Sequence, residues 1–297
     1  MTLSATARVA PLVDRHSPAP SVLATSFGKH LLLIGMAAIM IYPLGWMIAA
    51  SLRPGAAIND HSLWPGAAFT LDNYVQGWKG LGPVPFLRVL GNSLFIAVLS
   101  VIGNVLSCAM AAYAFARISF PGRGLLFAVM LGTLMIPYHA ILIPQYLMFR
   151  EFGWLNTPLP LVVPKFLATD AFFIFLLTQF FRNIPRDLDD AARIDGAGHF
   201  RIFTRVIVPL SVPALVTAAI FSFIYTWNDF FAPLVYLTKT ENYTIPLALR
   251  AFGDSSAESA FGILFAMSVV SLLPVIGLFI AFQRLLVEGI ATTGLKG

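Results

Sequence analysis

The chain has 297 residues, of which 58% are hydrophobic and only 11% charged, and its formal net charge is +5. Soluble domains average about 25% charged residues, so this chain has too few charges to cover a water-exposed surface. The positive residues form no basic stripe, which argues against a nucleic-acid partner. The single cysteine, Cys108, has no second cysteine for an internal disulfide and no metal-ligand spacing around it. The composition predicts a membrane protein.

The N-terminal part divides into a polar tail and an apolar stretch. Residues 1–28 are rich in Ala, Ser and Pro and lack apolar periodicity, which predicts a flexible cytoplasmic tail. The uncharged stretch 31–50 is either a signal-peptide core, because Ala49, Ala50 and Ser51 are small, or an uncleaved first span. Its length favours the span.

Five further apolar stretches are long enough to cross a bilayer, which needs about 20 apolar residues. They are 89–116, 125–149, 159–181, 206–228 and 261–282, and the start of the 159–181 stretch is the least sharply marked. We therefore predict an all-α, polytopic membrane protein with six transmembrane helices, in which one transmembrane domain over residues 29–297 follows the tail. Pro137 and Pro144 predict a bend in the third span.

The distribution of basic residues predicts the orientation of these spans. Six spans place both termini on the same side of the membrane. If that side is the cytoplasm, most of the Lys and Arg residues lie in inner segments, among them Arg117, Arg123 and Arg186. The positive-inside rule therefore predicts cytoplasmic termini.

The most polar part of the chain is the predicted cytoplasmic loop 182–205, whose local sequence predicts a helix, a break and a second helix. Asn183 and Pro185 suit the start of a helix. The acidic residues within 187–190 complement the positive end of the helix dipole, and Gly196 suits a C-terminal stop. One interpretation is a solvated connecting loop, which is common for charge runs.

The other interpretation of this loop is a docking knob for another protein. Small residues gather around the predicted break and would let a partner surface approach the backbone closely. These residues are Ala191, Ala192, Gly196, Ala197 and Gly198.

The loop also carries a recognisable signature. It reads Asp190-Ala191-Ala192, three residues, then Gly196-Ala197, with Val206-Ile207-Val208-Pro209 downstream. This pattern resembles the Glu-Ala-Ala, three residues, Gly signature of ABC importer inner-membrane permeases, in particular the maltose-type carbohydrate permeases of binding-protein-dependent transport systems. Asp190 stands where that family usually has Glu, so the charge is kept on a shorter side chain.

Shorter matches to the same family follow in order from about residue 30 to the C-terminus. They are Met135-Ile136-Pro137, Leu155-Asn156-Thr157, Asn183-Ile184-Pro185, Trp227-Asn228-Asp229-Phe230, Phe282-Gln283-Arg284 and Gly294-Leu295-Lys296-Gly297.

The resemblance implies the permease subunit of an ATP-driven, binding-protein-dependent importer in the cell inner membrane, with the ABC importer permease fold. The loop would then form a coupling helix on a separate ATPase. The residues expected to make that contact are Asp190, Ala191, Ala192, Asp195, Gly196 and Ala197. The last four residues, Gly294, Leu295, Lys296 and Gly297, would either reach between the ATPase subunits or form a frayed tail.

The chain itself has no G-x-x-x-x-G-K-[ST] run, which a P-loop ATPase needs to cradle phosphates. It is therefore predicted not to be an enzyme and to bind no cofactor. The resemblance implies four kinds of neighbour: a second, homologous permease subunit in a heterodimer, two ATP-binding subunits that carry ATP and Mg, an extracytoplasmic solute-binding protein, and the lipid bilayer. The expected cargo is a sugar or sugar-like solute.

Polar and aromatic residues inside the spans are candidates for the translocation path, because they can hydrogen-bond sugar hydroxyls or stack on a sugar face. The candidates are Tyr138, Gln145, Trp227 and Asn228, within a wider set that also includes Asn92, Asn104, His139 and Tyr225. Interhelical hydrogen bonding and interfacial anchoring are the alternative roles for each of them.

Two rival functions are an ion-coupled secondary transporter and a membrane-embedded enzyme. A secondary transporter needs a buried acid or base to carry an ion or proton, whereas Asp170 and Asp229 are expected to lie shallow, near the outer ends of spans. An enzyme needs a catalytic constellation, and His139 has neither an acid nor a nucleophile as an obvious partner in the sequence.

Overall fold

The computed structural model describes residues 20–54, 69–254 and 260–294. Over these ranges the regular structure is helical, apart from one isolated bridge between Leu81 and Val84. The chain divides into two compact units, residues 1–47 and 48–297. The predicted all-α class therefore agrees with the described part of the chain.

The first unit holds most of α1 (Pro20–Ser51), which contains the candidate span Gly28–Ser51. Helical structure starts at Pro20, which lies inside the stretch predicted as a tail. The remainder of that tail, residues 1–19, lies outside the described residues.

The described residues contain four helices that are long and apolar enough to cross a membrane, and six spans result if each of two bent helix pairs counts as one. In the second unit the candidates outside these bent pairs are Phe86–Arg117, Leu159–Asn183 and Phe261–Gln283. The predicted number of six is thus the upper end of what the helices allow.

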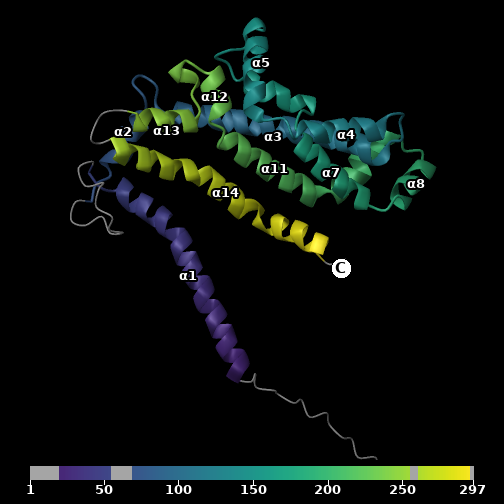
Figure 1. The fold of residues 1–297 in the computed structure, drawn as a ribbon, viewed down its shortest axis with the longest axis horizontal. Helices are drawn as coiled ribbons and strands as arrows, with labels where there is room; N and C mark the ends of the chain where they lie inside the picture. Colours follow the sequence, from purple (N-terminus) through teal and green to yellow (C-terminus); the bar gives the residue numbers. More distant parts are fainter. Residues whose placement is uncertain (1–19, 55–68, 255–259, 295–297) are drawn as a thin grey trace, which may run out of the picture. The chain divides into compact units, whose positions relative to one another are not determined.

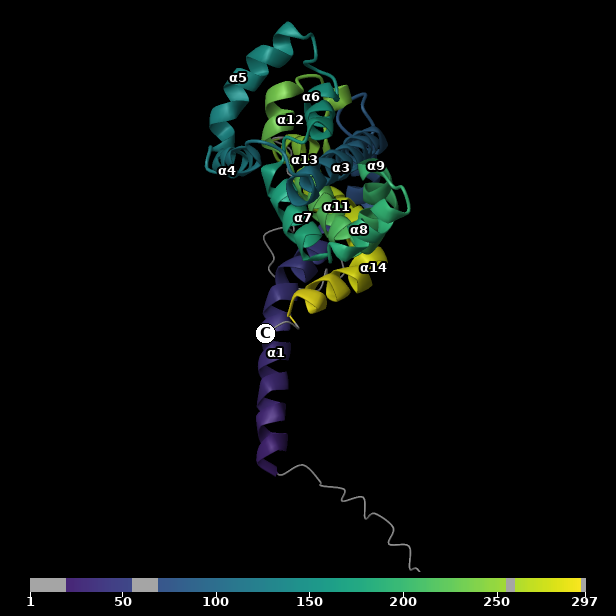
Figure 2. The same ribbon diagram turned by 90° about the vertical axis from the view of Figure 1, so that its right-hand side faces the viewer.

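The second unit is built around α3 (Phe86–Arg117). Helices α7 (Ala171–Asn183) and α11 (Val212–Trp227) pack against α3, and α14 (Ala260–Gly294) packs against α11. Figures 1 and 2 show these long helices running side by side. The second and sixth predicted spans correspond to α3 and α14. The fourth, 159–181, covers α6 (Leu159–Val162), η3 (Val163–Leu167) and α7, so its helix is interrupted before Ala171. The fifth, 206–228, was predicted as one continuous span, whereas the structure divides it at a bend before α11.

The third predicted span is sharply bent. Helices α4 (Arg123–Thr133) and α5 (Tyr138–Glu151) meet at an angle of 98°. Pro137 stands in extended backbone directly before α5, so it interrupts the helix as predicted. Pro144 lies inside α5.

A second bend precedes α11. The helical segment His199–Leu210 meets α11 at 80°, and the turn is at Ser211. Pro209 and Pro213 flank this turn, and neither has a backbone N–H to continue a helical ladder.

Short helices lie at the two ends of this unit, which we call the α13 end and the α8 end, and between them along the long helices (Figure 1). Their bounds are α2 (Asp72–Lys79), α6 (Leu159–Val162), η3 (Val163–Leu167), α8 (Asp187–Ile194), α9 (His199–Ile202), η4 (Phe203–Ile207), α10 (Val208–Leu210), α12 (Phe231–Tyr236), η5 (Thr240–Asn242) and α13 (Ile245–Gly253). Helices α2 and α13 lie at the first end, and α8 and α9 lie at the second.

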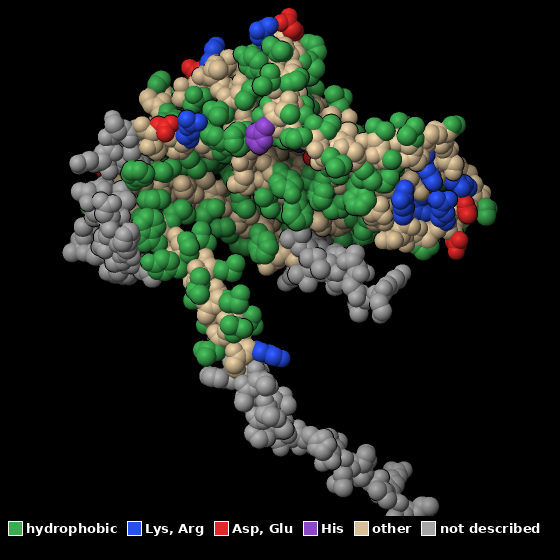
Figure 3. Space-filling view, in the orientation of Figure 1, with side chains coloured by type: hydrophobic (Ala, Val, Ile, Leu, Met, Phe, Trp, Pro, Cys, Tyr) green, Lys and Arg blue, Asp and Glu red, His purple; other side chains and the backbone are tan. Residues whose placement is uncertain are grey.

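Small residues on α3 let its neighbours approach closely. Ala109, Ala112 and Ala116 are buried in one apolar cluster with Phe181 of α7. A side chain at Gly103 would meet the ring of Phe166 at 2.5 Å. Close packing through small residues is typical of helices that associate within a membrane. In Figure 3, apolar side chains cover much of the middle of this unit, and charged side chains gather at its α8 end, toward its α13 end and at the top of the picture, over the tip of α5.

Candidate functional site

The predicted coupling loop adopts the helix, break and helix that its sequence predicts. Helix α8 is followed by a break and then by α9. The start of α8 differs from the prediction, because Asn183 is the last residue of α7 and α8 begins only at Asp187. Ile184 is extended, as a residue before proline prefers, so Pro185 separates the two helices instead of opening the second one.

Gly196 ends α8 in a Schellman motif. Its φ of +76° is in the left-handed region, its N–H donates to the Arg193 carbonyl at 2.9 Å, and the Ala197 N–H donates to the Ala192 carbonyl at 2.9 Å. These two bonds satisfy carbonyls that the helix end would otherwise leave unpaired. The chain consequently reverses at a fixed position.

The outer surface of this turn combines apolar and charged side chains. Ile194 is 87% exposed and Phe200 is 77% exposed. Of the six predicted contact residues, Asp190, Ala191, Asp195 and Gly196 are exposed, whereas Ala192 and Ala197 are half-buried against the core. A Cβ placed on Gly196 or Gly198 would meet nothing within 4 Å, so the space above both is open.

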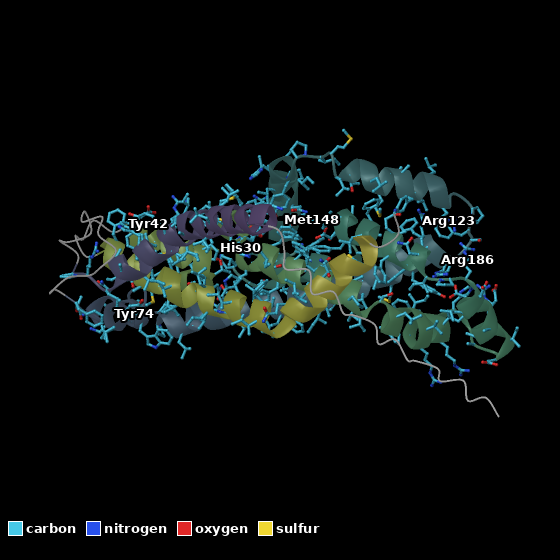
Figure 4. The ribbon with its side chains drawn as sticks, turned by 90° about the horizontal axis from the view of Figure 1, so that it is seen from below. His30, Tyr42, Tyr74, Arg123, Met148 and Arg186 are labelled. Carbon is cyan, nitrogen blue, oxygen red and sulfur yellow. The ribbon has the colours of Figure 1, made fainter. Side chains whose placement is uncertain are left out.

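Arginines surround this turn at the α8 end, where Figure 3 shows a basic surface with acidic side chains beside it. Figure 4 places Arg123 and Arg186 toward this end and Tyr74 toward the opposite one. The exposed arginines from the loop are Arg182, Arg186, Arg193, Arg201 and Arg205. This concentration is what the positive-inside rule associates with a cytoplasmic face.

The inner surface of α8 is held by a buried ion pair. Arg117, the last residue of α3, contacts Asp189 of α8 at 3.3 Å, and their side chains are only 1% and 5% exposed. The same guanidinium donates to the carbonyls of Phe181 at 2.6 Å and Ile184 at 2.7 Å, at the C-terminal end of α7. One side chain therefore joins three helices.

A second, weaker contact joins α3 to the loop. The Tyr113 hydroxyl lies 3.3 Å from Nδ1 of His199, and the Tyr113 ring packs on Phe203 at 5.2 Å between centroids. Sequence reasoning treated Arg117 as a topology signal and Asp189 as a dipole partner, and it missed both contacts. A local pattern could not reveal them, because the partners are 72 and 86 positions apart.

Between α5, α7, η3 and α12 lies a cavity of about 440 Å³, which a second cavity of about 430 Å³ adjoins. Both volumes are within the roughly 300–1,000 Å³ typical of small-molecule sites. Tyr138, Leu161, Lys165 and Asp229 line both cavities. Gln145 lines the larger one and accepts a hydrogen bond from Tyr236 at 3.1 Å. Burial raises the pKa of Tyr236 to about 12.

The charged groups at the cavity are partly satisfied by the protein. Lys165 lies 3.6 Å from Asp170 in an ion pair that lines the larger cavity. Asp229 accepts a bond from the Ala232 amide at 3.2 Å, at the start of α12. Asp170 thus has a side-chain partner and Asp229 a backbone partner, and both acids also line the wall of the larger cavity.

Of the other path candidates, Tyr225 lines the smaller cavity, whereas the following ones line neither cavity. Trp227 is 4% exposed and donates to the Ser271 carbonyl of α14, and Asn228 donates to Ile224 of its own helix. Asn104 donates to Ser222 of α11, an interhelical bond. Asn92 donates to the Glu241 and Tyr243 carbonyls at the α13 end.

At the α13 end a single asparagine fastens two loops. Asn156, from the predicted Leu-Asn-Thr match, has a φ of +60°. Its side-chain oxygen accepts bonds from the N–H and hydroxyl of Thr238 and from the N–H of Lys239, at 2.6–3.0 Å. Asn242 donates back to the Asn156 carbonyl. The predicted ATPase-contacting tail is described only as far as Gly294, the last residue of α14; 295–297 lie outside the described residues.

A family described as "Binding-protein-dependent transport system inner membrane component" matches residues 89–292, which include the bent spans, the α8 turn and the cavity. The chain belongs to this family. The predicted resemblance to ABC importer permeases is therefore confirmed, and the family is one of transport components rather than enzymes.

Several sequence relatives cover almost the whole chain. The trehalose transport system permease protein SugB of Mycobacterium tuberculosis is 36% identical over 267 residues, which are 90% of this chain and 95% of that protein. The trehalose/maltose transport system permease protein MalG of Thermococcus litoralis is 34% identical, over 91% of this chain and 97% of that protein. The arabinooligosaccharides transport system permease protein AraQ of Halalkalibacterium halodurans is 33% identical, over 90% of this chain and 96% of that protein.

The fold is similar to that of a bacterial ABC transporter involved in the import of the acidic polysaccharide alginate. The TM-score is 0.78 at 24% sequence identity, and the match covers 93% of this chain and 99% of that chain. A second crystal structure, of an alginate ABC transporter with a pentasaccharide-bound periplasmic protein, matches at a TM-score of 0.63 and 16% identity.

Proposed function

We propose that this chain is one permease subunit of an ATP-driven importer for a sugar or sugar-like solute, and that the α8 turn docks on a separate ATPase subunit. The observation that carries the docking role is the turn itself, where Ile194 and Phe200 expose apolar surface beside the Gly196 break. Large apolar side chains that remain exposed at a charged end suit a protein partner. A merely solvated connecting loop has no need of them.

The α8 end would face the cytoplasm in this arrangement, because the exposed arginines of the loop gather there. A helix of two turns that is held at both ends can transmit a displacement of the ATPase to the membrane helices. Helix α8 is fixed at its start by the Arg117–Asp189 ion pair and at its end by the Gly196 turn. ATP and Mg would be bound by the two ATPase subunits, and a second permease subunit would complete the path.

The cargo class rests on the relatives, whose names specify trehalose, maltose and arabinooligosaccharides. The paired cavities fit such a cargo, because their walls combine hydroxyl, amide and charged groups. Three predicted path candidates line them: Tyr138 lines both cavities, Gln145 the larger one and Tyr225 the smaller one. A periplasmic solute-binding protein would deliver the solute at the α13 end, where Asn156 holds the loops in a fixed shape.

The decisive experiment co-expresses this chain with its genomic neighbours and isolates it through a tag on this chain. We expect an ATPase to co-purify, and we expect solute uptake into vesicles to require both ATP and a binding protein. Ile194→Asp should strip the ATPase from the complex, because a charge replaces exposed apolar surface, whereas Ile194→Leu should retain it. Purification of the chain alone, with solute uptake driven by an ion gradient, would instead establish a secondary transporter.

The cavity role has a separate test. Gln145→Leu keeps the size of the side chain but removes its hydrogen-bonding groups, so we expect slower maximal uptake with the stimulated ATPase rate retained. Unchanged uptake at saturating binding protein would place the solute elsewhere.

A further inference from the structure

The contact that deserves a functional explanation is the buried ion pair between α3 and α8. Both side chains are almost fully buried, Arg117 at 1% and Asp189 at 5% exposure. Burying two charges requires their removal from water, and such a pair stabilises a fold little better than apolar residues of similar volume. The role of the Arg117–Asp189 pair is therefore better explained by how it positions and moves the helices than by its contribution to stability.

The geometry shows which parts the pair connects. Arg117 is the last residue of the central helix α3, and Asp189 lies in the first turn of α8. Between them the guanidinium also bonds the Phe181 and Ile184 carbonyls at the end of α7. The planar fork of an arginine can bind several acceptors in fixed directions, whereas lysine offers a flexible point charge.

The backbone between α7 and α8 is a weak mechanical connection. Only Ile184, Pro185 and Arg186 separate α7 from α8, and Ile184 is extended. Without the ion pair, a displacement of α8 would reach α7 through that short connection. It would reach α3 through the hydrogen bond from Arg186 to the Ala116 carbonyl, at 3.4 Å, and through the Tyr113–His199 contact. The ion pair adds a buried, charged link from the first turn of α8 to α3, which packs against both α7 and α11.

The pair also has spare bonding capacity. Nε of Arg117 and Oδ1 of Asp189 are buried and lack hydrogen-bond partners within the described protein. A single contact at 3.3 Å thus uses one atom of each group, whereas arginine and carboxylate frequently bond through two parallel contacts. A small shift of α8 relative to α3 can therefore be accommodated without breaking the pair.

We infer that Arg117 and Asp189 are positioning residues that transmit the displacement of α8 to α3, so that ATP hydrolysis on the partner is converted into movement of the central helix. This inference rests on the proposed docking of α8. It assigns no contact with ATP or with the solute to either residue. The pair acts as the joint between the docking turn and the helices that surround the cavity.

The test compares Asp189→Asn with Asp187→Asn in the assembled complex reconstituted into vesicles. Both changes remove one acid from the first turn of α8, but Asp187 is exposed. The readout is the amount of solute transported per ATP hydrolysed. For Asp189→Asn we expect this ratio to fall at least about fivefold, the lower end of typical coupling between sites, with the ATPase still bound. Asp187→Asn should keep the wild-type ratio, and Asp189→Glu should recover part of it.

A double variant guards against simple misfolding. Arg117→Met with Asp189→Leu removes both charges together, so no lone charge is left buried. It should assemble and hydrolyse ATP, yet transport poorly. The inference is overturned if this double variant transports with the wild-type ratio, or if Asp189→Asn lowers hydrolysis and transport equally. Absence of any ATPase from the wild-type preparation would overturn the docking proposal instead, before a variant is compared.

Discussion

The two ends of the second unit are fastened by different chemistry. At the α8 end a buried arginine and aspartate join α3, α7 and α8. At the α13 end amide side chains bond backbone groups: Asn92, together with the exposed Arg88, holds the 241–243 segment, and Asn156 holds the 238–239 segment. An amide bonded to backbone fixes a loop without burying a charge, whereas an ion pair leaves a costly buried charge when either partner is lost. The α13 end is thus built as a fixed frame, and the α8 end as a joint that depends on two specific residues.

The largest expected effect on stability comes from replacing Arg117, the α3 partner of the buried ion pair. Arg117→Met leaves the Asp189 carboxylate buried without a counter-ion, and two α7 carbonyls lose their donor. We expect a loss of about 3–5 kcal/mol in the free energy of unfolding. Denaturant or thermal unfolding in detergent micelles measures it.

The matched control is Arg193→Met, because Arg193 also pairs with an aspartate of α8 but is 48% exposed. That change should cost less than about 1 kcal/mol. Equal losses for both variants would show that the burial of the Arg117 pair has no special consequence.

At the α13 end we expect a smaller loss of stability when Asn156 is replaced. Asn156→Ala removes the acceptor of three hydrogen bonds and puts an alanine at a φ of +60°. We expect a loss of about 2 kcal/mol, since left-handed backbone alone costs roughly 1–2 kcal/mol and the bonds are largely exposed. Asn156→Gly separates the cost of backbone strain from the cost of the lost hydrogen bonds, because glycine relieves the strain without restoring the bonds.

If the two ends act independently, Asn156→Ala should leave ATPase co-purification unchanged. A complex that loses its ATPase through this change at the α13 end would contradict the comparison.

The same contrast explains how far the sequence predicts this molecule. Apolar length predicts candidate spans, and proline predicts the bend at Pro137, because both are local properties of the chain. The bend before α11 was not predicted. The Gly196 stop is also local, since left-handed backbone strongly favours glycine. The Arg117–Asp189 contact was missed because it depends on how three helices pack, and an arginine after a span reads equally well as a topology signal.

Path residues illustrate a second limit of sequence reasoning. Tyr138 and Trp227 are both aromatic residues near the ends of helices, yet Tyr138 lines the cavities and Trp227 packs against α14. Which face of its helix a residue occupies depends on the rotation of that helix in the bundle. Hydrophobicity on nearly every side of α11 leaves no polar stripe to reveal it.

A third prediction concerns the end of α8. Gly196→Ala should cost about 1 kcal/mol, because alanine adopts a φ of +76° only with strain. Gly198→Ala is the matched control, since Gly198 is extended with a φ of −75° and has equally open surroundings. Amide hydrogen exchange along α8 measures the local loss. Equal exchange in both variants would mean that the turn does not limit the stability of α8.

The smallest expected effect on stability comes from Asp190→Asn. Asp190 pairs with Arg193 at 3.0 Å, but the two side chains are 65% and 48% exposed, so water screens the attraction and we expect a change within about 0.5 kcal/mol. Retention of the ATPase during purification, followed over a series of salt concentrations, is the informative measurement. If α8 docks as proposed, the loss of this exposed charge should weaken retention while unfolding stays unchanged. Asp189→Asn should show the reverse order, with reduced stability and a retained ATPase, because its carboxylate faces α3 and not the partner. If Asp190→Asn and Asp189→Asn change unfolding stability and ATPase retention in the same way, the inner and outer surfaces of α8 have no separate roles.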